Sequence, residues 1–172
     1  MTTTASNRNN DQPDELNLLR IYLRDHEAAA AGGSELFRRC SKSNQGTPYG
    51  AELQRLANEV RRARDDLRDI CRQFDVSFSK VGRAMAFAGV AVGRLKMNGR
   101  ILRYSPLSRV IELETMSSGV LSQLRLWESL LQVAEGDTRL DKAALARHVA
   151  DANDQLETLR SLHERAADDA FI

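Results

Sequence analysis

Apolar residues recur every three or four positions along four long stretches of this chain, and that spacing is what most constrains its fold. It places apolar side chains on one face of a helix, and helices with such a face pack side by side. In the first stretch, residues 14–42, the repeating positions are Leu16, Leu19, Leu23, His26, Ala30, Gly33, Phe37 and Cys40. In residues 49–74 they are Leu53, Leu56, Val60, Ala63, Leu67, Ile70 and Phe74. The polar segment 41–48 between them predicts a turn, and hence an antiparallel helical hairpin.

The second half of the chain predicts another hairpin, with marked helix ends. Ser105 followed by Pro106 is typical of a helix start, because a hydroxyl cap precedes proline in the first turn. We expect that helix to run to residue 134, before Gly136, and Asp141 to cap a last helix that ends near residue 170. In the first helix, the small residues 28–33 predict that a neighbouring backbone approaches closely.

A shorter helix is predicted over residues 77–97, between the two hairpins. In a ferritin-like bundle the second and third long helices run parallel, so the chain must cross back along the bundle between them. A helix of about twenty residues, roughly 30 Å long, is sufficient for that. We therefore expect an all-α fold, a ferritin-like four-helix bundle with an additional shorter crossover helix. The alternative is a five-helix up-down bundle.

Composition agrees with a helical protein in water. Of the 172 residues, 42% are hydrophobic and 28% charged, and only three are proline. Residues 1–13 are polar and predict a disordered leader, which leaves a single domain over 14–172. No apolar run approaches the roughly 20 residues of a membrane span. We therefore expect a cytoplasmic protein.

Ferritin-like bundles raise the question of a di-metal centre, which needs Glu-x-x-His on two of the helices. The chain contains no such motif, and Arg62 and Arg160 stand where the histidines would follow Glu59 and Glu157. Residues on antiparallel helices lie at one level when their numbers have a nearly constant sum. By that measure one level gathers three ligand-type residues, and these are the candidate metal ligands if a metal binds: Glu59, Glu114 and His163.

The level argument places the three histidines at different heights, so that they cannot share one metal ion. We expect His163 to pair with Glu114, His148 to pair with Glu128, and His26 to be a hydrogen-bonded core histidine. Cys40 and Cys71 fall near opposite ends of the first hairpin, roughly 30 Å apart by helix rise, which predicts buried thiols and no disulfide.

The stretch 76–111 contains seven Lys or Arg residues and no Asp or Glu. It is either a solvated face balanced by the acidic last helices or a surface for an anionic partner such as nucleic acid or anionic lipid. The residues of such a surface, around the turn before the fourth helix, are Arg94, Lys96, Arg100, Arg103 and Arg109.

Two segments carry a resemblance to known proteins, YLRDHEAAAAGG at 22–33 and GRLKMNGRILRYSPLSRVIELE at 93–114. They resemble an uncharacterised, mostly actinobacterial family of helical-bundle proteins, and the likeness covers residues 16–168. The family has no assigned activity, so the resemblance implies a bacterial helical bundle but no catalytic or binding residue.

No glycine-rich phosphate loop follows a strand, and neither cysteine has a base beside it in the sequence. We therefore expect no catalytic residues and no cofactor, and a non-catalytic structural or binding protein that self-associates. Two alternatives remain open. One is a ferritin-like, metal-dependent oxidoreductase with a degenerate site, and the other is an anion-binding module that uses the basic stretch.

Overall fold

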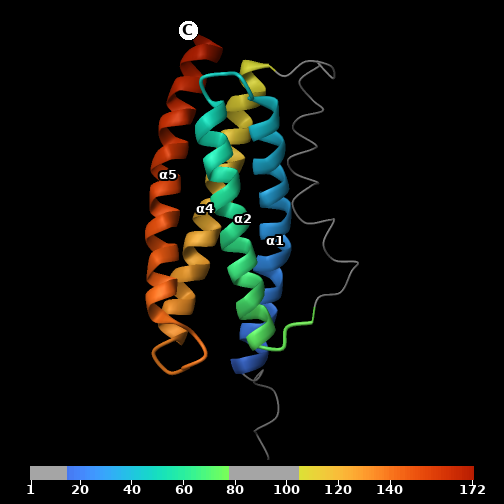
Figure 1. The fold of residues 1–172 in the computed structure, drawn as a ribbon, viewed down its shortest axis with the longest axis vertical. Coiled ribbons are helices and arrows are strands. Elements are labelled where there is room, and N and C mark those ends of the chain that lie inside the picture. The colour runs from blue at the N-terminus through green and yellow to red at the C-terminus, as the bar shows by residue number, and fades with distance from the viewer. Residues whose placement is uncertain (1–14, 78–104) are drawn as a thin grey trace, which may run out of the picture.

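The computed structural model describes residues 15–77 and 105–172, and their regular structure is entirely helical. Four long helices lie side by side along the long axis of the molecule (Figure 1). They are α1 (Glu15–Ser43), α2 (Gly50–Gln73), α4 (Pro106–Val133) and α5 (Lys142–Phe171). The expected bounds of all four are correct to within one or two residues, so the all-α bundle is confirmed.

The four helices form two antiparallel hairpins, α1 with α2 and α4 with α5 (Figure 1). α2 and α4 run in the same direction, so the end of α2 and the start of α4 lie at opposite ends of the bundle. The shorter helix expected over 77–97 lies outside the described residues, except for Ser77. Between the hairpins, α1 packs against α4, whereas α2 and α5 contact each other much less.

Side-chain caps begin the second hairpin as predicted. The Ser105 hydroxyl accepts a hydrogen bond from the backbone N–H of Ser108 at 3.2 Å, and Pro106 follows in the first turn. The Asp141 carboxylate accepts from the N–H groups of Ala143 and Ala144 at 2.8 and 3.1 Å. Each cap satisfies donors that the first turn of a helix leaves without a partner.

Backbone geometry marks both ends of α2. After α2, Asp75 adopts a positive φ of 54°, and the Val76 N–H donates back to the Cys71 carbonyl at 2.9 Å, which closes the helix in a Schellman motif. At Gly50, the first residue of α2, a Cβ would lie 2.7 Å from the Asn44 carbonyl oxygen. Only glycine allows that close approach.

The buried side chains form two clusters along the bundle axis. One, toward the α1–α2 turn, contains Phe37, Leu53 and Leu113, and the other, toward the α4–α5 turn, contains Leu67 and Trp127. In the described helices no segment is long and apolar enough to cross a membrane.

Candidate binding pocket

An apolar pocket of about 290 Å³ lies between α1, α2 and α4, near the middle of the bundle. We call it the α1–α4 pocket. Its walls include Ala29, Leu36, Val60, Leu67, Met116 and Leu126. An engineered apolar cavity of about 150 Å³ stays dry and binds benzene, so a cavity about twice that size has room for a molecule of about two aromatic rings.

Two mid-helix glycines face the space of the α1–α4 pocket from facing helices. Gly33 of α1 and Gly119 of α4 both line it, and a Cβ built on either one meets no atom within 4 Å. Each glycine costs its helix up to about 1 kcal/mol relative to alanine. A close backbone contact therefore does not explain why either position lacks a side chain. The expectation that a neighbouring backbone approaches the first helix closely is wrong at Gly33.

Trp127, the only tryptophan of the chain, lines the pocket from α4 and is 0% exposed. Its ring stacks on the ring of His148 from α5, with centroids 4.4 Å apart and planes at 17°. The indole Nε1–H is buried and has no acceptor among the described residues. Leaving a buried donor unpaired costs about 1 to 3 kcal/mol, and such groups are rare in folded proteins.

A buried ion pair borders the pocket on the α2 side. Glu27 of α1 has a side chain that is only 2% exposed, and its Oε1 accepts from Arg64 Nη2 at 2.9 Å and from Arg68 Nε at 3.0 Å. Arg64 also lines the pocket, and its Nε–H is buried with no acceptor in the described part of the chain. Both unpaired buried groups at this pocket are therefore hydrogen-bond donors.

His26 lines the pocket from α1, next to a contact between α1 and α4. The His26 and Tyr22 rings meet edge to face with centroids 4.4 Å apart, and the Tyr22 hydroxyl lies 3.3 Å from Ser129 Oγ of α4. Burial lowers the pKa of His26, against the opposing charge of Asp25. The imidazole is therefore neutral at pH 7, and His26 itself adds no charge to the pocket.

The other seam between the hairpins holds a polar cleft of about 490 Å³, which we call the α2–α5 cleft. Its lining includes Arg62, Asp66, Arg147, His148, Asp151 and Gln155. His148 Nε2 lies 3.3 Å from Asp66 Oδ2. Burial lowers the pKa of His148, while the carboxylates of Asp66 and Asp151 act to raise it. Gln155 Oε1 is buried without a donor within the described ranges, so the unpaired group here is an acceptor.

The candidate metal ligands are only partly brought together. His163 Nε2 lies 3.4 Å from Glu114 Oε1, which confirms that predicted pair. Glu59 instead accepts from Arg55 Nη1 at 2.8 Å and from Gln155 Nε2 at 3.3 Å. Nowhere in residues 15–77 and 105–172 do three His, Cys, Asp or Glu side chains group as a metal ion would require.

Of the five residues proposed for an anionic surface, only Arg109 is described; Arg94, Lys96, Arg100 and Arg103 lie outside the described ranges. Arg109 Nε donates to Asn44 Oδ1 at 2.8 Å, and its guanidinium lies 4.1 Å from the Tyr49 ring centroid. The Tyr49 hydroxyl donates to Asp169 Oδ2 at 2.6 Å, and burial and that bond raise the tyrosine pKa. Arg109 also lies 3.5 Å from Asp169 Oδ2, so it links α4 to the α1–α2 turn and to α5 at one end of the bundle.

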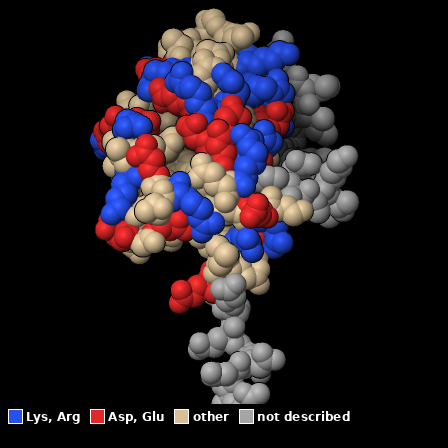
Figure 2. Space-filling view, turned by 60° about the horizontal axis from the view of Figure 1, so that its bottom comes forward, with Lys and Arg blue, Asp and Glu red and all other residues tan. Residues whose placement is uncertain are grey.

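Charge on the described surface is mixed. On the face that Figure 2 shows, the side chains of Lys and Arg are interspersed with those of Asp and Glu. Neighbouring charges of opposite sign reduce the long-range attraction of that face for a polyanion.

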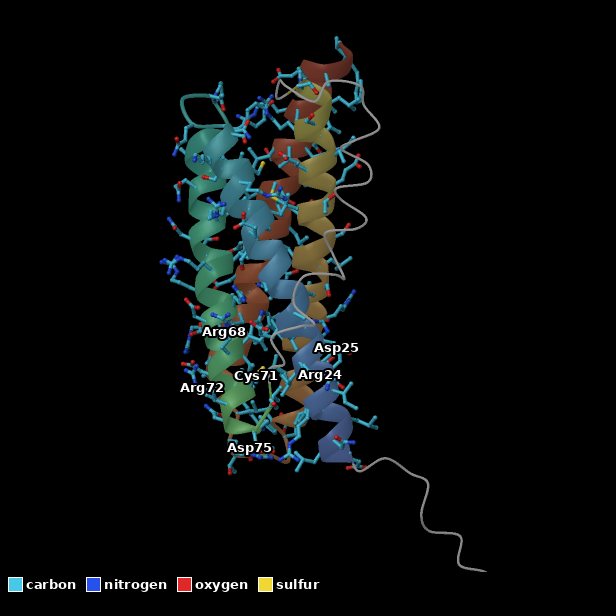
Figure 3. All side chains as sticks on the ribbon, turned by 90° about the vertical axis from the view of Figure 1, so that its right-hand side faces the viewer. Arg24, Asp25, Arg68, Cys71, Arg72 and Asp75 are labelled. Carbon is cyan, nitrogen blue, oxygen red and sulfur yellow. The ribbon has the colours of Figure 1, made fainter. Side chains whose placement is uncertain are left out.

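Both cysteines are buried thiols and neither is in a disulfide, as expected. Cys71 lies on the side of α2 that faces α1, while the neighbouring Arg72 points away from the bundle (Figure 3). Burial is the main cause that raises the pKa of Cys71 to about 12. Because the thiolate is the reactive form, Cys71 is unreactive in the folded protein.

Sequence reasoning missed the main features of the α1–α4 pocket. The run of small residues at 28–33 was a signal for the pocket, but it was interpreted as a close contact between helices and not as an open space. Glu27 was missed because it lies beside the apolar seam, although the arginines at 64 and 68 of α2 are one turn apart and face its level. His148 lies at the predicted level, but it contacts Trp127 and Asp66 instead of Glu128.

Comparison with known proteins found no matching family model, no matching curated protein and no matching solved structure. The site is therefore interpreted from its own geometry.

Proposed function

We propose that this protein is a non-catalytic helical-bundle protein that binds a small, largely apolar molecule in the α1–α4 pocket. The observation that carries the proposal is the apolar space itself, about 290 Å³ between α1, α2 and α4, which the described side chains leave unfilled. Known ligand sites have the same character, an apolar concavity with few polar groups. Gly33 and Gly119 support the proposal because each leaves room on the pocket side that a side chain could have filled.

The first experiment uses the neutral dye N-phenyl-1-naphthylamine, which accepts excitation energy from tryptophan. Bound in the pocket, it should quench Trp127 emission and fluoresce itself upon excitation of the protein. Replacing either pocket glycine by leucine, Gly33→Leu or Gly119→Leu, should abolish the signal by filling the space. Ala150→Leu is the matched control, because Ala150 is exposed on α5, away from the pocket.

Equal binding of the dye by the wild-type protein and both glycine variants would contradict the proposal. The proposal would also be contradicted if the wild-type protein did not bind the dye and both glycine variants unfolded. The space would then be occupied by another part of this chain, such as residues 78–104.

We also propose that the bundle is ferritin-like, that the protein is cytoplasmic and that it self-associates. Four exposed apolar side chains on the outer surfaces of α1 and α4 support self-association, namely Leu18, Ile21, Leu107 and Leu121. Sedimentation velocity at several concentrations tests it. A concentration-independent monomer would remove self-association and leave the pocket untouched.

The metal-dependent alternative is tested by metal analysis of protein purified without added iron or zinc. Stoichiometric metal that is lost in Glu114→Gln and His163→Gln would favour the oxidoreductase over the proposal.

A further inference from the structure

Three charged residues line the α1–α4 pocket, and one of them is poorly paired. Arg64 contacts the buried Glu27 at 2.9 Å, and Glu35 contacts Arg38 at 2.7 Å. Arg39 has only Glu35 Oε1 at 3.9 Å, and its guanidinium makes no hydrogen bond to any other described residue. Among the lining residues at this end and their direct partners, one carboxylate therefore faces two guanidiniums, which leaves one positive charge.

The poorly paired charge lies at one end of a long, narrow space. The part of α1 that lines the pocket extends from His26 to Arg39, which is about 20 Å at 1.5 Å per residue. At the other end lie His26, which is neutral at pH 7, and the fully buried ring of Trp127. A volume of about 290 Å³ spread over that length suits a single extended chain with its charge at one end.

We propose that the ligand of the α1–α4 pocket is a fatty-acid-like carboxylate, with its alkyl chain in the apolar space and its carboxylate paired with Arg39. The proposal rests on the proposed function, because it assumes that the pocket holds a small molecule. A guanidinium offers a planar fork of donors that matches a carboxylate. The Arg39 side chain is 48% exposed, so the ligand's charge is not buried on binding.

The single remaining charge favours a carboxylate over a phosphate monoester. A carboxylate carries one negative charge, whereas a phosphate monoester carries nearly two at pH 7. With Glu35 at the same end, a second negative charge on the ligand would have no positive partner among the pocket-lining residues.

The test compares octanoate with octan-1-ol, which has a chain of the same length and no charge. Because Trp127 is the only tryptophan and lines the pocket, ¹⁵N-labelled protein gives one indole N–H signal whose shift reports binding of either molecule. The alcohol is more hydrophobic than the anion, so the informative quantity is the ratio of the octanoate affinity to the octanol affinity.

Replacing Arg39 should lower that ratio. We expect it to fall about 3- to 5-fold in Arg39→Gln, the value of a half-exposed ion pair. Arg24→Gln is the matched control and should leave the ratio unchanged. Arg24 is on the same helix, is 52% exposed and is paired at 3.6 Å with Asp25, but it does not line the pocket.

Two further variants test the two ends of the ligand separately. Glu35→Gln should raise the ratio, because it removes a like charge beside the carboxylate and releases Arg38. Gly33→Leu should abolish binding of both molecules by filling the space of the alkyl chain. Octanoate that still binds to folded Gly33→Leu would bind outside the pocket, and the inference would be wrong.

The outcomes separate this inference from the proposed function. If octanol or the neutral dye binds in the pocket while octanoate does not, or if Arg39→Gln leaves the ratio unchanged, the pocket binds apolar molecules but the carboxylate inference is wrong. An equal fall in Arg39→Gln and Arg24→Gln would also overturn it, because the effect would then come from net charge alone. If octanoate, octanol and the dye all fail to bind, the proposed function and the inference both fall.

Discussion

Antiparallel helices form both seams between the hairpins, but the two seams differ in packing and in chemistry. On the α1–α4 side the helices pack together, and a pocket remains where Gly33 and Gly119 provide no side chain. On the α2–α5 side the helices contact each other little, and charged residues such as Asp66 and Arg147 line an open cleft. Glu27, which borders the pocket, is buried and paired, whereas Asp66 in the cleft is 56% exposed. Glu35 and Arg39, which also line the pocket, are about half exposed. The two seams of one bundle thus differ in how closely the helices pack and in how much charge lines them.

The largest expected effect comes from Trp127, which lines the α1–α4 pocket and stacks on His148 of the α2–α5 cleft. Trp127→Ala should lower the free energy of unfolding by about 3 to 5 kcal/mol, because it removes a fully buried ring and its stack on His148. Urea denaturation measures the change. Arg147→Ala, in the cleft, should stay within about 0.5 kcal/mol. Similar losses in the two variants would break the distinction between an apolar, packed seam and a charged, loosely packed one.

Glu27 tests whether charge beside the pocket is buried. Glu27→Gln should cost about 3 kcal/mol, because two partly buried arginines lose their counter-charge. Glu35→Gln is the matched control on the same helix. Its carboxylate is 51% exposed and pairs with Arg38 at the surface, so the expected loss is below about 1 kcal/mol. Equal losses would mean that water reaches Glu27.

The glycines test whether the pocket is open space. Gly33→Ala and Gly119→Ala should each raise the free energy of unfolding by up to about 1 kcal/mol, since alanine favours the helix and its Cβ meets no atom within 4 Å. Gly50→Ala should be destabilising, because its Cβ would press on the Asn44 carbonyl. Destabilisation by the first two would show that the space is filled in solution.

Each seam contains one histidine whose pKa is lowered by burial, His26 at the pocket and His148 in the cleft. The folded protein therefore binds fewer protons than the unfolded chain below about pH 6.5. Stability that is fully present above that pH should be lost as the pH falls through the lowered pKa values. Unfolding free energies at pH 7.5 and 5.5 test this. His148→Gln and His26→Gln should each flatten the slope, and an unchanged slope in both would refute it.

Most of the fold could be predicted from the sequence because local rules determine it. The apolar spacing defined the four helices, and Ser105 and Asp141 fixed two starts through side-chain caps. The level of a residue along the bundle was also predictable, as the pair of Glu114 and His163 shows. Helix rise and chain direction set that level, and both can be read from residue numbers.

The pocket could not be predicted, because it depends on how far each helix is rotated and spaced from its neighbours. His148 lies at the expected level, yet its ring meets Trp127 and Asp66, since the rotation of α5 about its axis selects the partner. Gly33 illustrates the same limit. A small residue on a helix face is compatible with close contact and with empty space, and only the position of α4 distinguishes the two.

The contact between Tyr49 and Asp169 joins residues 120 positions apart in the chain, while each hairpin closes through a turn of a few residues. Closing a long loop costs more chain entropy than closing a short one, and it must precede the contacts that reward it. We therefore expect each hairpin to form early and the contact between Tyr49 and Asp169 to form late. The refolding rate should then report how fast the two preformed hairpins dock.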